Sequence, residues 1–218
     1  MKRWMALLCV VALLGMLAAP PVRAERRAYV FDKAHSQINF VAEATLISAH
    51  GYFERFDGQV EIDPDKLEDS TLSLSIETAS INTQVAMRDN DLRSARFFDA
   101  QNFPTITFAS KQITKVDAQN LKITGDLTIR GVTKTVEVPV RIVFLRDGRG
   151  RFKGEFQINR HDFKVSYDSR MNHIEDMVTV QFDLNLMDKQ MMEERQRSAT
   201  EKGGQQRQQQ PPPAKPPL

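Results

Sequence analysis

Cysteine is almost absent from this sequence, since the 218 residues contain only Cys9. Cys9 lies in an N-terminal apolar run that we expect the mature protein to lose. Without it, thiol catalysis, thiolate metal sites and disulfide bonds are excluded. A body of roughly 165 residues can form a sufficient hydrophobic core without disulfides.

A charge excess of either sign is also missing. The chain has 30 Lys and Arg residues against 28 Asp and Glu, a formal net charge of +2. Lys2, Arg3 and Arg23 lie in the first 24 positions, which hold no acidic residue, so removal of this segment takes the net charge to −1. Nucleic-acid binding relies on a clear basic excess, so we exclude nucleic acid as a partner.

Long hydrophobic runs are absent except at the N-terminus. A basic start precedes the apolar segment 4–19, and the small-residue pattern Val-Arg-Ala follows at 22–24. A membrane-spanning helix needs about 18–20 apolar residues, more than this segment offers before Pro20. The pattern is typical of a secretory signal peptide. We expect residues 1–24 to be cleaved, the mature protein to be exported, and no stable membrane insertion.

Alternation of apolar and polar residues dominates the body of the chain, residues 25–188. A period of two is typical of a strand with one buried face. It recurs in segments 37–42, 71–77, 105–108, 121–130, 136–144, 152–158 and 178–186. Short turns between such strands require antiparallel pairing. We expect an all-β fold of seven to nine strands, either a two-sheet sandwich or a closed barrel, and the long strands favour the barrel because closure removes exposed edges.

Two segments break this alternation. Residues 88–98 show none and offer Asp and Asn as helix caps, so we expect a short helix that either closes one end of the barrel or packs on its outer surface. The residues from 189 to 218 are polar and end in a Gln- and Pro-rich stretch that cannot offset its ordering entropy by burial. We expect this tail to be disordered after one or two helical turns, and binding of a partner by the tail stays open.

No catalytic or metal-binding pattern is present. The four histidines lack the close spacing that ligands of one metal ion show on a strand or helix. His35 and Ser36 are neighbours on one strand and point to opposite faces. The segment 146–150 contains two glycines but joins two strands, as a hairpin turn does. The residues therefore offer no candidate catalytic centre, and we expect a protein that is not an enzyme and has no metal or cofactor.

Phenylalanine is the abundant aromatic residue, with 13 Phe against 3 Tyr and 1 Trp. Six lie in the inward phase of the alternation: Phe40, Phe108, Phe144, Phe152, Phe156 and Phe182. A barrel of about eight strands can either fill with its own side chains or hold one slender ligand. The residues alone leave both alternatives open.

Several motifs, in order along the chain, resemble the YceI-like family. They are Tyr29–Ser36, Gly51–Gly58, Arg88–Ala100, Phe103–Phe108, Gly125–Lys134 and Asn159–Phe163. The resemblance implies an eight-stranded antiparallel, lipocalin-like barrel in the periplasm that holds a polyisoprenoid or an isoprenoid quinone and performs no catalysis. Asp91, Arg96 and Lys164 depart from the family pattern, and the first two change the charge beside the expected helix.

We therefore expect an exported binding or carrier protein whose only ligand is an isoprenoid lipid in the barrel interior. The expected pocket residues lie on inward strand positions and near the helix: Phe40, Phe53, Ile76, Arg88, Leu92, Arg93, Phe97, Phe98, Phe108, Leu127, Ile129 and Phe156. The alternative is a ligand-free periplasmic interaction module with a solid core and a partner-binding tail. A homodimer through exposed strands also stays open.

Overall fold

The fold comes from a computed structural model that describes residues 26–167 and 171–208; the expected signal peptide, 1–24, lies outside this range. The strands are β1 (Arg27–Phe31), β2 (Gln37–Ala44), β3 (Ala49–Phe53), β4 (Phe56–Ile62), β5 (Thr71–Glu77), β6 (Ile81–Asn82), β7 (Thr105–Lys115), β8 (Asn120–Ile129), β9 (Val132–Arg146), β10 (Arg149–Asn159) and β11 (Ile174–Asp188). The helices are α1 (Ala86–Arg93) and α2 (Lys189–Gln208), with 3-10 turns η1 (Leu67–Asp69), η2 (Thr78–Ser80) and η3 (Arg160–Phe163).

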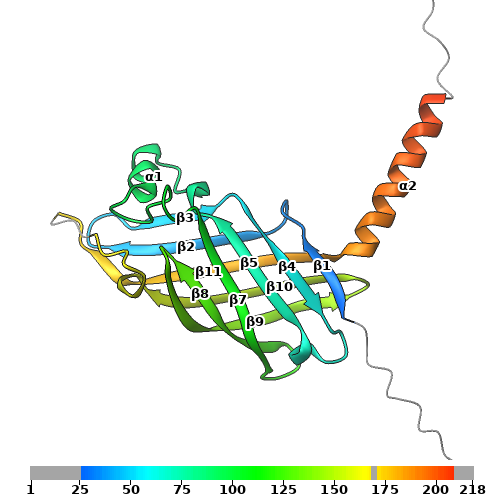
Figure 1. Cartoon of the computed structure of the whole chain (residues 1–218), viewed down its shortest axis with the longest axis horizontal. Helices are drawn as coiled ribbons and strands as arrows, with labels where there is room; N and C mark the ends of the chain where they lie inside the picture. The colour runs from blue at the N-terminus through cyan, green and yellow to red at the C-terminus, as the bar shows by residue number, and fades with distance from the viewer. Residues whose placement is uncertain (1–25, 168–170, 209–218) are drawn as a thin grey trace, which may run out of the picture.

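Eight antiparallel strands pair in a closed ring. Figure 1 shows the barrel that they form. The ring runs β1, β4, β5, β7, β8, β9, β10 and β11, and the pairing of β1 with β11 closes it. Strands β2, β3 and β6 continue the wall beside β11. The closed barrel is confirmed, and the two-sheet sandwich is not the fold. In the part of the chain that the structure describes, no helix has both the length and the apolar character needed to cross a membrane.

Three strands of this barrel are interrupted at the same level. β1 and β2 both pair with β11. On one side of the interruption β1 pairs with β4, and β4 pairs with β5. On the other side β2 pairs with β3, and β3 pairs with β6. Each of these couples is therefore one strand in two parts, and every strand of the barrel pairs with the next along the chain. Phe56 pairs with Ile76 on one side of the break, and Phe53 pairs with Ile81 on the other. Between these two pairs the first chain segment has the residues 54–55, whereas the segment that contains η2 has the residues 77–80 and is therefore two residues longer.

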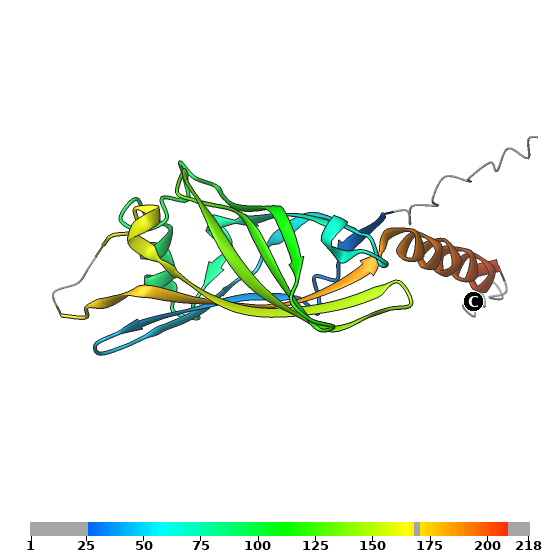
Figure 2. The same cartoon turned by 90° about the horizontal axis from the view of Figure 1, so that it is seen from below.

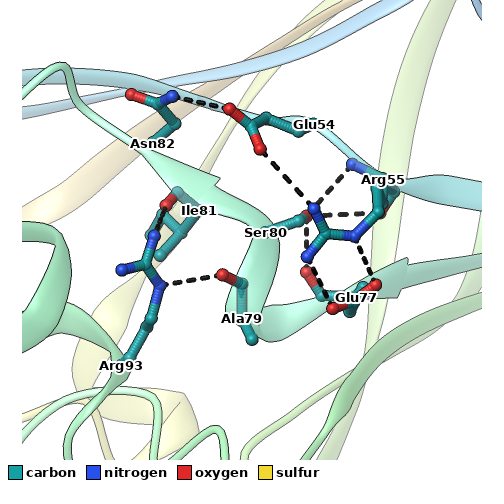
Figure 3. Close-up of polar contacts among 8 residues, drawn as sticks. All are labelled: Glu54, Arg55, Glu77, Ala79, Ser80, Ile81, Asn82 and Arg93. Atoms are coloured by element: carbon teal, nitrogen blue, oxygen red, sulfur yellow. Dashed lines mark hydrogen bonds and ion pairs between the residues drawn. The ribbon is translucent and has the colours of Figure 1, made fainter.

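Polar contacts hold this break together (Figure 3). Ser80 Oγ donates to the Glu77 carbonyl and accepts from the Arg55 backbone N–H. The Arg55 guanidinium forms a two-pronged ion pair with the Glu77 carboxylate, at 2.6 and 2.7 Å. These hydrogen bonds hold the pKa of the Glu77 carboxyl below its ordinary value. The interruption of these strands is therefore stabilised by specific hydrogen bonds and an ion pair.

The seven alternating segments correspond to β2, β5, β7, β8, β9, β10 and β11. The expected helix near 88–98 is α1, which begins earlier and is shorter. It ends at Arg93 because Ser94 adopts an extended conformation while its backbone N–H bonds the Asp91 carbonyl. The chain that follows forms turns, and in one of them the Phe98 backbone N–H donates to the Leu92 carbonyl.

The tail differs from the expected disorder over its first part, because α2 continues to Gln208. Asp188 Oδ1 accepts from the backbone N–H groups of Gln190 and Met191, at 2.9 and 3.4 Å, and so caps the first turn. The residues that follow are mostly good helix formers. Met191 lies against Gly148 in the β9–β10 turn. Figures 1 and 2 show α2 projecting from the end of the barrel opposite α1; residues 209–218 lie outside the described chain.

Candidate functional site

An apolar cavity of about 490 Å³ occupies the interior of the barrel. Every strand of the closed ring contributes to its wall. The cavity extends from Leu72 and Val140 near the η1 end to Ile47 and Asn172 near the α1 end. The interior is therefore hollow and is not filled by its own side chains.

The inward phenylalanines leave this space open because their rings lie along the wall. Phe40 covers Gly51 of the paired strand, where an added Cβ would lie 2.4 Å from the Phe40 Cζ atom. Phe182 covers Gly154 in the same way, with the corresponding distance at 2.3 Å. A ring that rests on a neighbouring glycine does not project to the barrel axis. A phenylalanine-rich interior is thereby compatible with a cavity.

Eleven of the twelve expected pocket residues lie on the cavity wall. They are Phe40, Phe53, Ile76, Arg88, Leu92, Phe97, Phe98, Phe108, Leu127, Ile129 and Phe156. Their contact with a ligand stays a prediction. Phe144, expected to point inward, does not line the cavity. The pairing of β10 with β9 shifts between Ile142 and Phe144, and this bulge takes Phe144 out of the inward phase.

Arg93 is the expected pocket residue that the structure places elsewhere. Its Nε donates to the Ala79 carbonyl at 2.8 Å, and its Nη2 donates to the Ile81 carbonyl at 2.7 Å (Figure 3). Its Nη1 bonds Asn90 in the same helix, at 3.3 Å. Arg93 therefore fastens α1 to the interrupted strand β5–β6 and does not face the cavity.

Arg88, one turn earlier in α1, does line the cavity. Its Nε donates to Thr83 Oγ1 at 2.8 Å, and its Nη2 donates to the Thr83 carbonyl at 3.0 Å. The buried Asp89 accepts from the Thr83 backbone N–H and hydroxyl, at 2.8 and 2.5 Å. These bonds fix the start of α1 and hold Arg88 at the cavity. Asp91, also on the wall, pairs with Arg96 at 3.3 Å.

Arg160 is a wall residue that the sequence reasoning did not single out. Its side chain is 5% exposed. The guanidinium donates to four backbone carbonyls at 2.9–3.1 Å, those of Val165, Tyr167, Ile174 and Glu175. It thereby holds the chain between η3 and β11 in place. The available signal was its position inside the motif Asn159–Phe163.

The charged residues of the wall all come from one end of the barrel. Arg88 and Asp91 belong to α1, and Arg160 belongs to η3. Figures 1 and 2 both show these elements at the same end. Arg130 joins the two regions by donating to the Ala95 and Lys164 carbonyls, both at 2.6 Å. The charged residues of the cavity wall therefore lie beside α1, and the rest of the wall is mostly apolar.

Groups that could hold a metal ion, with three or more His, Cys, Asp or Glu side chains, are absent from residues 26–167 and 171–208. Two histidines instead pair with single carboxylates at the surface. His35 Nδ1 lies 2.9 Å from Asp32, and His161 Nε2 lies 2.8 Å from Asp176.

Comparison with known proteins identifies a family and a set of related structures. The YceI-like domain matches residues 29–186. Protein YceI of Escherichia coli O17:K52:H18 is 34% identical over 148 residues, which span 64% of this chain and 77% of that protein. The crystal structure of BcnA from Burkholderia cenocepacia matches with a TM-score of 0.67 at 29% identity, covering 71% of this chain and 98% of that one.

A further structural match is a domain from Saccharophagus degradans described as a polyisoprenoid binding domain. Its TM-score is 0.61 at 17% identity, and the match covers 74% of this chain and 99% of that domain. At this identity the likeness shows a shared fold.

Proposed function

The chain belongs to the YceI-like family, and on that premise we propose that it is an exported, non-enzymatic binding or carrier protein for an isoprenoid lipid held inside its barrel. The observation that carries the proposal is the apolar cavity of about 490 Å³. This volume falls within the roughly 300–1,000 Å³ of small-molecule sites. The fold shared with a domain described as polyisoprenoid-binding supports the same ligand class.

The shape and polarity of the cavity suit a long apolar chain with one polar end. Burial of an isoprenoid chain stabilises the complex by about 25 cal/mol for each Å² of apolar surface, less the cost of association. The head group would lie at the α1 end, where Arg88 and Asp91 line the wall. Because both side chains already bond groups of the protein itself, selectivity for a particular head group is weak.

The composition of the wall supports binding over catalysis. The described residues that line the cavity include neither histidine nor cysteine. Arg160, the most deeply buried of its charged residues, donates to the protein's own carbonyls. A side-chain nucleophile activated by an adjacent histidine, a common arrangement for covalent catalysis, therefore has no counterpart among these lining residues.

Solvent extraction followed by mass spectrometry tests this function directly. Protein purified from its own periplasm without detergent should release an isoprenoid lipid. Leu127→Trp should lower the bound lipid several-fold, because the indole takes space inside the cavity, while the lipid-free protein keeps its stability to within about 1 kcal/mol. Overpacking of a solid core would instead cost roughly 1–3 kcal/mol.

Thr128→Trp is the matched control, since Thr128 lies on the same strand and does not line the cavity. It should leave the lipid content unchanged. Wild-type extracts that contain no isoprenoid, together with unfolding of the Leu127→Trp protein, would overturn the proposed function.

One observation favours a second candidate function, an interaction module. Helix α2 projects away from the barrel (Figures 1 and 2), and its side chains at 194–198 are exposed. A helix in this position is accessible to a protein partner. Deletion of residues 193–218 separates the candidates, because lipid content should persist in a carrier, whereas an interaction module would lose its partner in co-purification from periplasmic extract.

Export is the remaining part of the proposal. The basic start, apolar segment 4–19 and Val-Arg-Ala at 22–24 support cleavage after Ala24. N-terminal sequencing of the periplasmic protein should read Glu25 first. Retention of Met1 in a membrane fraction would overturn this part while leaving the lipid-binding proposal open to its own test.

A further inference from the structure

Exposed apolar side chains gather at the α1 end of the barrel. The large apolar residues that are exposed in the described chain are Leu46, Ile47, Val85, Met87, Val116, Met171 and Met177. Six of the seven belong to the β2–β3 loop, the start of α1, and the chain that leads into and begins β11. Figures 1 and 2 show these segments at one end of the barrel. Only Val116, in the β7–β8 turn, lies at the other end. Single exposed apolar residues are ordinary, but a one-sided group indicates an interaction surface.

The β2–β3 loop presents its side chains on a backbone with several of its polar groups hydrogen-bonded. Asn172 Oδ1 accepts from the N–H groups of Leu46 and Ile47, at 2.8 and 3.2 Å, and its Nδ2 donates to the Ile47 carbonyl at 3.1 Å. The Thr45 N–H donates to the His173 carbonyl at 2.9 Å. An apolar medium penalises unsatisfied backbone groups heavily, so this bracing suits a loop that leaves water.

This rim is continuous with the cavity. Ile47 lines the cavity and is also 69% exposed to solvent. Asn172, which braces the loop, is on the cavity wall as well. Leu46 is 69% exposed, and Met171, the residue before Asn172, is 82% exposed. An apolar path therefore leads from the outer surface into the barrel at this end.

We propose that Leu46, Ile47, Met87 and Met171, here called the apolar rim, dock on the surface of a lipid bilayer, and that the isoprenoid lipid enters and leaves the cavity there. The inference rests on the proposed function. An isoprenoid chain resides in a membrane and is strongly disfavoured in water, so transfer needs a route that stays apolar. The rim side chains come from three segments, the β2–β3 loop, the first turn of α1 and the chain before β11, which suits shallow insertion into a fluid interface at several points.

Co-sedimentation with vesicles of phosphatidylethanolamine and phosphatidylglycerol tests the rim with the mature, full-length protein. The variant Leu46→Ser/Met87→Ser/Met171→Ser changes three exposed residues, none of which lines the cavity. Its vesicle-bound fraction should fall about tenfold or more, because three apolar side chains no longer enter the interface. Val116→Ser, the matched control at the opposite end, should bind vesicles as the wild type does.

The rate at which each protein takes up an isoprenoid lipid from the vesicles is the second measurement, and the rim variant should be slowed in parallel. Thermal melting checks that all three proteins fold. Equal vesicle binding by wild type and rim variant would overturn the rim proposal. So would loss of a dimer in light scattering without loss of vesicle binding, which would make the rim an interface between two copies. If wild-type protein binds vesicles through the rim yet never contains isoprenoid, the proposed function fails and the docking surface stands.

Discussion

Arginines at the α1 end illustrate how much a single residue's role depends on its bonding partners. Arg88 and Arg93 lie in the same helix, yet Arg88 lines the cavity and Arg93 binds the Ala79 and Ile81 carbonyls. Arg160 comes from a distant segment and satisfies four carbonyls. Arg93 and Arg160 therefore hold other backbone segments in place, a role that depends on the fold and that the residue type alone does not reveal.

Substitution of Arg160 should be among the most damaging single changes. Arg160→Met keeps much of the side-chain volume but leaves the four carbonyls it bonds without their donor. We expect a loss of about 3 kcal/mol in the free energy of unfolding, measured by urea denaturation. Arg93→Met removes two such bonds and should cost less. Equal stability of the Arg160→Met protein and the wild type would contradict this account.

A pH-dependent contribution should come from Asp183 on β11. Arg151 donates to its carboxylate at 2.9 and 2.7 Å, and Lys153 lies at 3.0 Å. The hydrogen bonds from Arg151 chiefly hold the pKa of Asp183 below its ordinary value. A carboxyl with a lowered folded-state pKa stabilises the fold above the unfolded pKa, about 3.9, and loses this contribution as pH falls through the folded pKa.

Asp183→Asn should therefore destabilise the protein by at most about 1 kcal/mol at pH 7, since Arg151 is 37% exposed and solvent screens the pair. The difference between variant and wild type should shrink as the pH falls below about 4. Urea midpoints across this range provide the measurement. Arg151→Met should give the same profile, and a difference that persists at low pH would show that the ion pair is not its origin.

Glycine and phenylalanine pairs are features of the strands, and they control the cavity. Gly51→Ala on β3 places a methyl group against the Phe40 ring and Thr83 Cγ2, both of which are side-chain atoms. Phe40 lines the cavity, and a shift of its ring away from the added methyl group would take space from the ligand, so we expect bound lipid to fall several-fold with a stability loss of about 1–2 kcal/mol. Gly51→Ala/Phe40→Leu shortens the ring partner and should restore lipid content. Unchanged lipid content in the single variant would show that the Phe40 ring does not border the ligand.

The sequence predicted the long strands and two parts of the interrupted ones, β2 and β5, whereas alternation did not predict β1, β3, β4 or β6. From β8 to β11 each strand alternates over seven or more residues, and the pattern is clear even though β9 carries a bulge, whereas β7 alternates clearly only over 105–108. β3 and β6 have five and two residues, too few for a period to emerge. Both lie beside the break, where the Arg55 backbone N–H donates to Ser80 Oγ across 25 residues of sequence, a contact that a local pattern does not predict.

The cavity itself could be anticipated only in part. Alternation correctly placed Phe40, Ile76 and Leu127 on the inner face. Whether an inner face encloses space depends on how its side chains meet across strands, as Phe182 meets Gly154. That meeting depends on register, which an alternating pattern leaves undetermined.

At the scale of the whole molecule, the barrel and α2 meet through a small contact. Met191 lies against Gly148, and Asp188 caps the helix. Truncation after Lys202 should leave the melting temperature unchanged, because the described contact lies in the first turn. Truncation after Asp188 removes Met191 and should lower the melting temperature by about 2–4 °C. A larger loss on truncation after Lys202 would show that the distal part of α2 docks on the body.

The pairing of β11 with β1 and β2 has a consequence for folding kinetics. When each interrupted strand is counted as one, every other strand pairs with its neighbour along the chain, so most of the wall can form through short loop closures. The pairing that closes the barrel instead joins residues near 29 to residues near 188. A chain emerging N-terminus first cannot close until β11 is available, and its edges at β1, β2 and β10 remain open to pairing with other chains. A chain that ends before Ile174 should therefore aggregate, as light scattering would show, so the last strand also protects solubility.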